Sequence, residues 1–139
     1  MSLDLMRKRI ETVVTNAMAI QYPAITIKYE NVRFTPPAKA KYIAIYILDG
    51  QSVQAELGDN AVIRYPGIVQ VDCLAPEDTA TSGLNVMAQF IADTLKRKNY
   101  QLEDGAFLKL RTPAIKSLGT NAGWNRKVVT IDYLRDEQP

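Results

Sequence analysis

The sequence contains no histidine at all, and this absence excludes more chemistry than any residue that is present. Histidine is the side chain that titrates near neutral pH and the commonest metal ligand, so Ser-His, Cys-His and His-metal sites are all excluded. Catalysis would have to rely on carboxylates, lysine, tyrosine or serine. The acidic pairs Glu77-Asp78 and Glu103-Asp104 are better explained by helix capping and by a turn than by catalysis. We therefore predict that the protein is not an enzyme.

Cysteine and long apolar runs are scarce as well. Cys73 is the only cysteine, so it can neither form an internal disulfide nor complete a zinc site. We interpret it as a small buried strand residue, and a lone thiol favours a reducing compartment. No apolar run approaches the ~20 residues needed to cross a bilayer, and no signal peptide is visible. These absences predict a soluble protein made and kept in the cytoplasm.

A strong excess of charge of one sign is also missing. Lys and Arg number 17 against 15 Asp and Glu, which gives a net charge of +2. A nucleic-acid-binding protein normally concentrates far more positive charge. The length of 139 residues and the 47% apolar content favour one globular domain spanning residues 1–139.

Hydrophobic periodicity predicts two helices and several strands. Apolar residues at helical spacing predict one helix over residues 3–20, ended by Pro23, and a second that begins after Pro76. Lys96, Arg97 and Lys98 close the second helix, where basic residues interact well with exposed carbonyls. Apolar alternation or apolar runs predict strands over residues 25–29, 41–48, 52–57, 68–74, 107–110 and 127–134, and residues 61–64 form a short apolar segment.

Turn-forming residues predict the connections between these strands. Asp49-Gly50 favours a type I′ hairpin turn that leads into the strand at 52–57. Pro66-Gly67 separates the short apolar segment at 61–64 from the strand at 68–74. Small residues predict a loop over 116–123, and residues 136–139 are expected to form a frayed tail.

These elements predict an α+β fold: a mainly antiparallel sheet of five or six strands with two helices packed on one face. The strand at 42–48 is apolar on both of its faces. The two helices cover only one face, so something else must shield part of the other. An edge loop, a folded-back hairpin and another subunit are the open alternatives.

Basic residues offer an alternative function, that of a nucleic-acid-binding module. The candidate residues are Lys96, Arg97, Lys98, Lys116, Arg126 and Lys127. Trp124, the only tryptophan, stands beside two of them. It is typical of a residue packed over the sheet and, as a rival interpretation, of a subunit contact, because aromatic residues and arginine are enriched at interfaces.

Several weak motifs spread over most of the chain carry a family resemblance. They are Met6-Arg7-Lys8-Arg9-Ile10, Arg33-Phe34-Thr35-Pro36-Pro37, Tyr65-Pro66-Gly67-Ile68-Val69-Gln70-Val71-Asp72, Ala75-Pro76, and a helix over 85–97 whose start contains Gly83. With them the sequence resembles the small tail-terminator proteins of long-tailed bacteriophages and prophages.

The resemblance implies a structural subunit that assembles into a homo-hexameric ring. Such a ring caps the tail tube and docks the head, so its partners would be copies of itself, the tail-tube protein and a head–tail connector protein. The resemblance implies no cofactor, no metal, no membrane and no catalytic residue, and it implies a place in the virion tail after assembly in the bacterial host cytoplasm. A neighbouring head–tail connector is an open alternative. The residues expected to make contacts are Pro36, Pro37, Asp49, Gly50, Leu118, Trp124 and Arg126.

Overall fold

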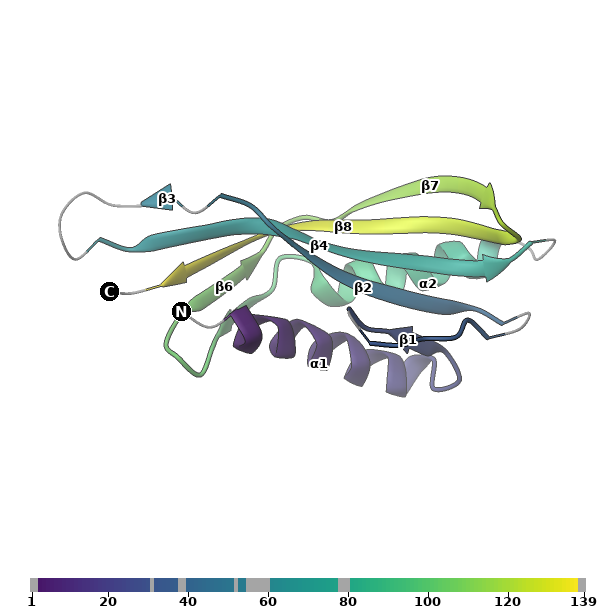
Figure 1. Cartoon of the computed structure of the whole chain (residues 1–139), viewed down its shortest axis with the longest axis horizontal. Helices are drawn as coiled ribbons and strands as arrows, with labels where there is room; N and C mark the ends of the chain where they lie inside the picture. The colour runs from purple at the N-terminus through teal and green to yellow at the C-terminus, as the bar shows by residue number, and fades with distance from the viewer. Residues whose placement is uncertain are drawn as a thin grey trace.

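Two long antiparallel strands form the centre of the protein (Figure 1). The computed structural model describes residues 3–30, 32–37, 40–51, 53–54, 61–77 and 81–137. The central strands are β4 (Ile63–Pro76) and β8 (Trp124–Glu137), each of 14 residues. They pair without a register shift along their whole length, from Ile63 opposite Glu137 to Pro76 opposite Trp124.

The other strands extend the sheet on both sides of this pair. β2 (Tyr42–Asp49) and then β3 (Val53–Gln54) pair with β4, and β1 (Thr26–Lys28) runs parallel to β2. On the other side, β7 (Ala114–Asn121) and β6 (Phe107–Leu110) pair with β8, and β5 (Asn99–Gln101) lies outside β6. The predicted α+β class is confirmed. The sheet is mixed because β1 is parallel, and short strands bring its strands to eight within the described residues.

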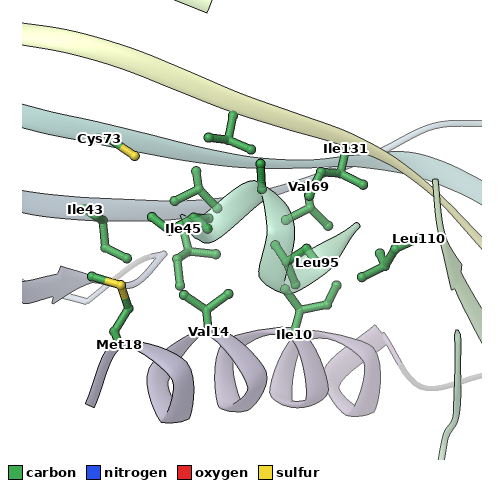
Figure 2. Close-up of a cluster of buried hydrophobic side chains, with 14 of the residues drawn as sticks. Ile10, Val14, Met18, Ile43, Ile45, Val69, Cys73, Leu95, Leu110 and Ile131 are labelled. Carbon is green, nitrogen blue, oxygen red and sulfur yellow. The ribbon is translucent and has the colours of Figure 1, made fainter. Parts of the chain in front are cut away.

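Both helices, α1 (Leu3–Gln21) and α2 (Thr81–Leu95), lie on the same side of the sheet (Figure 1). In α1 the buried residues recur at every fourth position, which gives one continuous apolar stripe. Figure 2 shows Ile10, Val14 and Met18 of this stripe pointing from α1 into the hydrophobic core, which also contains Ile43, Ile45 and Leu95. The prediction of two helices on one face is therefore confirmed.

The Pro66-Gly67 pair does not separate residues 61–64 from the strand at 68–74, as the sequence predicted, because β4 runs straight through it. Gly67 is required there by the ring of Tyr133, which packs against the glycine from the neighbouring strand. A Cβ atom on Gly67 would stand 2.5 Å from the Leu48 carbonyl oxygen and 2.5 Å from the Tyr133 ring. Because glycine has no side chain, it leaves room for the Tyr133 ring within a continuous strand.

The hairpin turn predicted at Asp49-Gly50 was also wrong. Val53 and Gln54 pair with β4, not with β2, and Gly50 has no positive φ. The Gly50 N–H donates instead to the Pro66 carbonyl at 2.8 Å, so the chain continues along β4 after β2. Positions 52 and 55–57 of the predicted return strand lie outside the described residues.

Two further segments predicted to be irregular are strands. Most of the expected loop at 116–123 belongs to β7, and the turn is confined to Ala122 and Gly123, whose φ values are 52° and 84°. Such a pair is what a two-residue hairpin turn requires. The expected frayed tail is likewise ordered as far as Glu137, and Asp136 is buried. Positions 138–139 lie outside the described residues.

Candidate assembly interface

The sheet face opposite the helices is only partly covered. Side chains alternate along each strand, so Ile43 and Ile45 face the helices while Tyr42, Ala44 and Leu48 face the other way. Leu48 and its cross-strand neighbour Ile68 are 48% and 37% exposed. We call the surface on this side of the sheet the open face. Its apolar residues are accessible at the Leu48 end and buried at the Tyr42 end.

An aromatic cluster closes the Tyr42 end of the open face. The Tyr42 ring lies 5.1 Å from that of Phe34 and 4.9 Å from that of Trp124, centroid to centroid, with the Trp124 ring edge-on at 87°. Edge-to-face geometry of this kind is favourable for aromatic pairs. Burial raises the pKa of the Tyr42 hydroxyl. Of the three alternatives for shielding this face, the loop that carries Phe34 supplies the cover at this end.

Four of the expected contact residues belong to the same end of the sheet, which we call the aromatic end. Pro36 and Pro37 follow Phe34 within three positions, and Trp124 is part of the cluster itself. Arg126 lies two residues further along β8, opposite Leu74. Its Nε is buried and has no hydrogen-bond partner among the described residues. Aromatic residues and arginine are the types enriched at protein interfaces, and this end of the sheet brings both together.

Leu118 lies close to this end, on the exposed edge strand β7. Every side chain from position 114 to 120 is exposed. β7 pairs with β8 on one side and with no described strand on the other, so it is an edge strand. Leu118 is the additional residue of a β-bulge between Ser117 and Gly119, and it is 49% exposed. A bulge shortens the regular edge available for strand pairing.

Asp49 and Gly50 lie apart from these five residues, toward the other end of β2. The Asp49 carboxylate accepts a hydrogen bond of 2.8 Å from the Tyr133 hydroxyl. Burial and this hydrogen bond raise the pKa of Tyr133, so its hydroxyl stays protonated. Tyr133 therefore crosses Gly67 and joins β8 to the end of β2, a contact that the turn-forming sequence at Asp49-Gly50 did not indicate.

Polar groups near the last residues of β8 were missed by the sequence prediction. Arg64 donates two hydrogen bonds to Asp136, of 2.8 and 3.0 Å, and these bonds lower the pKa of Asp136. The fully buried Arg135 pairs with Glu137 at 3.0 Å and stacks 4.5 Å from the centroid of the Tyr65 ring. The alternation of apolar residues up to Leu134 was the available signal, because it continues without a turn residue into this segment.

The basic residues of the alternative function do not form one surface. Lys96, Arg97 and Lys98 follow α2, whereas Lys116 and Lys127 belong to the β7–β8 hairpin. Within the hairpin, Lys127 shares the helix side of the sheet with Val129, and Lys116, opposite Val128, is on the open face. The nucleic-acid alternative therefore gains no support from the fold.

The remaining candidate chemistry is structural. Burial raises the pKa of the Cys73 thiol to about 12, which leaves no reactive thiolate at neutral pH. Asp104 accepts the Ala106 N–H at 3.1 Å in a turn, and Glu103 pairs with Arg9. Asp78 lies outside the described residues. In the described part of the chain, no three Cys, Asp or Glu residues gather as a metal site would need, and neither helix could span a membrane.

The chain is similar to known proteins in both sequence family and fold. A family model described as phage tail terminator protein matches residues 3–133. One solved structure, whose name states no function, superposes with a TM-score of 0.80 at 20% identity, covering 100% of this chain and 99% of the other. A chain from the virion of a native gene transfer agent particle superposes with a TM-score of 0.54 at 13% identity, covering 99% and 100%. None of the curated proteins compared with the chain matches it.

Proposed function

Because the chain belongs to the phage tail terminator family, whose model matches residues 3–133, we propose that it forms a ring that caps the tail tube and docks the head. Family membership identifies the chain as a structural protein of phage tails. This membership is the observation that carries the proposal. The ring, its contacts with the tail-tube and connector proteins, and assembly in the host cytoplasm are the finer parts of the proposal.

The geometry supports assembly through more than one surface. In a closed ring each copy contacts the next head to tail, so a subunit needs two different surfaces for its neighbours. We assign Pro36, Pro37, Trp124 and Arg126 of the aromatic end, with Leu118 on the adjacent edge strand, to these contacts. Asp49 and Gly50 are exposed but lie away from that surface. We therefore assign them to a separate contact, with a tube or head protein.

Deletion of the gene in its parent phage or prophage tests the function. A tube without its terminator has nothing to stop subunit addition, so we expect overlong tails without heads in electron micrographs, and rescue by the wild-type gene in trans. Headless tails of normal length would identify a head–tail connector instead. Normal tails joined to heads would contradict both assignments.

Two matched variants test the contact surface. We expect Trp124→Ala to prevent rescue of the deletion, because it removes the largest side chain of the aromatic end. Val86→Ala removes an exposed apolar side chain from the outer face of α2 and should rescue fully. Circular dichroism spectra of both purified variants must match the wild type. Full rescue by Trp124→Ala would remove the aromatic end from the proposed interface.

A further inference from the structure

Two basic segments that are separate in the sequence lie side by side where α2 ends. The first is Lys96 to Lys98, and the second contains Lys109 and Arg111 of the β6 region. The Arg97 N–H donates to the Arg111 carbonyl at 3.1 Å, and the Leu110 N–H donates to the Lys98 carbonyl at 2.8 Å. We call these five cationic residues the basic corner. Only the first segment is among the basic residues that the sequence offered for nucleic-acid binding.

The basic corner is hollowed and has an excess of positive charge. Its acidic neighbours include Asp132, whose backbone carbonyl accepts the Arg111 N–H, and Asp136, whose pKa Lys109 helps to lower. Arg97 and Arg111 line a depression of about 470 Å³, together with Asn99, Leu110 and Thr112. All five cationic side chains of the corner are exposed, and none of them forms an ion pair within the described residues. The depression therefore offers two guanidinium groups and neutral hydrogen-bonding groups to an oxyanion.

The end of α2 does not account for this concentration of charge. A helix C-terminus corresponds to about half a negative charge, which one cation near the last turn would offset. Arg97 has a φ of 54°, a backbone conformation that glycine adopts more readily than arginine. Neither the dipole nor the chain reversal after Leu95 calls for five cations.

We propose that the basic corner docks an acidic segment of another protein subunit in the same particle, with Arg97 and Arg111 pairing to its Asp or Glu carboxylates. This docking rests on the proposed function. Arginine suits the role because its planar fork binds a carboxylate through two parallel hydrogen bonds. The basic corner is a different surface from the aromatic end. The 15 residues of α2 separate the two surfaces by about 22 Å.

A protein segment fits the corner better than a nucleic acid does. A phosphate backbone needs cations that follow it over a long track. The next cation along the edge is Lys116, five residues after Arg111, which corresponds to about 17 Å of extended chain. Lys127 lies on the helix side of the sheet. The charge is thus concentrated at one place, as for a short run of carboxylates.

Cross-linking in assembled particles locates the acidic partner. A carbodiimide joins a lysine amine directly to a carboxylate in contact with it. We expect mass spectrometry to show amide links from Lys96, Lys98 or Lys109 to Asp or Glu residues of another subunit. Lys8, an exposed lysine on α1 outside the corner, is the internal control and should show at least tenfold fewer such links. Equal linkage of Lys8 and the corner lysines, or links only within one chain, would overturn the proposal.

A charge-matched pair of variants separates this proposal from the function itself. R97Q/R111Q and R7Q/K8Q each remove two positive charges, the first pair from the basic corner and the second from the surface of α1. We expect R97Q/R111Q to lower the rescue of the gene deletion at least tenfold, and R7Q/K8Q to rescue as the wild type does. Full rescue by R97Q/R111Q, in a phage whose deletion gives defective tails, would reject the docking site and leave the function standing. A deletion without any tail defect would reject the function.

Binding of a fluorescent 30-base-pair DNA duplex gives a direct test of the competing ligand. We expect the purified wild-type protein and R97Q/R111Q to bind this duplex equally weakly at low salt. Tight binding by the wild type that weakens steeply with salt and is lost in R97Q/R111Q would overturn the proposal in favour of a nucleic acid.

Discussion

The two faces of the sheet differ in what covers them. The face toward α1 and α2 is sealed: Val69, Val71, Val129 and Ile131 are all fully buried. The open face carries polar residues such as Gln70 and Thr130 on the same central strands. It leaves Ile68 of β4 and Leu48 of the neighbouring β2 exposed. Because neighbouring residues of one strand belong to different faces, the same backbone supports two surfaces of different character.

This difference indicates how folding and assembly are divided in the molecule. The helix-covered face contains the hydrophobic cluster that supplies most of the favourable burial. The open face contributes only a small aromatic cluster, so its remaining apolar residues are available for contacts with other subunits. Substitutions on the first face should change the stability of the monomer, and those on the second should change its assembly.

The largest effect is expected from Ile131→Ala, which deletes a fully buried side chain on the helix-covered face. We expect the free energy of unfolding to fall by about 3 kcal/mol, because transfer and cavity terms add at such a site. Ile68→Ala makes the same chemical change on the open face and should cost less than about 1 kcal/mol. Urea denaturation followed by fluorescence measures both. Equal losses would mean that the two faces do not differ in the way described.

A second large effect is expected at Gly67, against which the Tyr133 ring packs. Gly67→Ala places a Cβ atom 2.5 Å from backbone and ring atoms, so strand β2 or the ring must shift. We expect a loss of about 2 kcal/mol, typical of overpacking. Pro66→Ala, at the adjacent residue on the open face, is the control and should cost clearly less. A Gly67→Ala variant as stable as the wild type would show that the Tyr133 packing does not restrain β4.

The sequence predicted those elements whose period is set by burial on one face. The sequence placed Met6, Ile10 and Val14 on the apolar face of the first helix, and the structure confirms that all three are buried in α1. The strand β6 was also found, because Leu108 and Leu110 alternate with exposed residues. In each case local spacing and tertiary burial give the same answer.

The errors have a common physical cause. Pro66-Gly67 and Asp49-Gly50 have the composition of turns, but each contacts the distant residue Tyr133. Its ring packs against Gly67, and its hydroxyl donates a hydrogen bond to Asp49. No local pattern reveals a partner more than sixty positions away. The contact between Tyr42 and Trp124 was hidden for the same reason, since the strand register brings together the first residues of β2 and β8.

A pH-dependent contribution is expected from the ion pair between Arg64 and Asp136. The hydrogen bonds from Arg64 lower the pKa of Asp136 below its usual value of 3.8. The stabilisation is therefore complete above that usual value and is lost as the pH falls through the lowered pKa. We expect Asp136→Asn to lower the urea midpoint at pH 7, and the difference from the wild type to shrink between about pH 4 and pH 2.

Asp4 provides the control for this pair. Its pKa is likewise lowered by a hydrogen bond from Arg7, but its side chain is 59% exposed on the surface of α1. Solvent screens such a pair, so Asp4→Asn should leave the midpoint almost unchanged at every pH. A similar pH dependence in both variants would show that the Asp136 pair, at the ends of the central strands, stabilises the protein no more than the exposed Asp4 pair does.

The smallest effect on the monomer is expected from Leu118→Gln, at the bulge of the exposed edge strand. Surface substitutions of this kind stay within about 0.5 kcal/mol, because the side chain has few neighbours to lose. A large effect on assembly with no effect on unfolding is what a contact surface requires. We therefore expect Leu118→Gln to match the wild type in urea while rescuing the gene deletion at least tenfold less well. An unfolding free energy lowered as much as in Ile131→Ala would instead place Leu118 in the core, and full rescue would free the β7 edge from any contact.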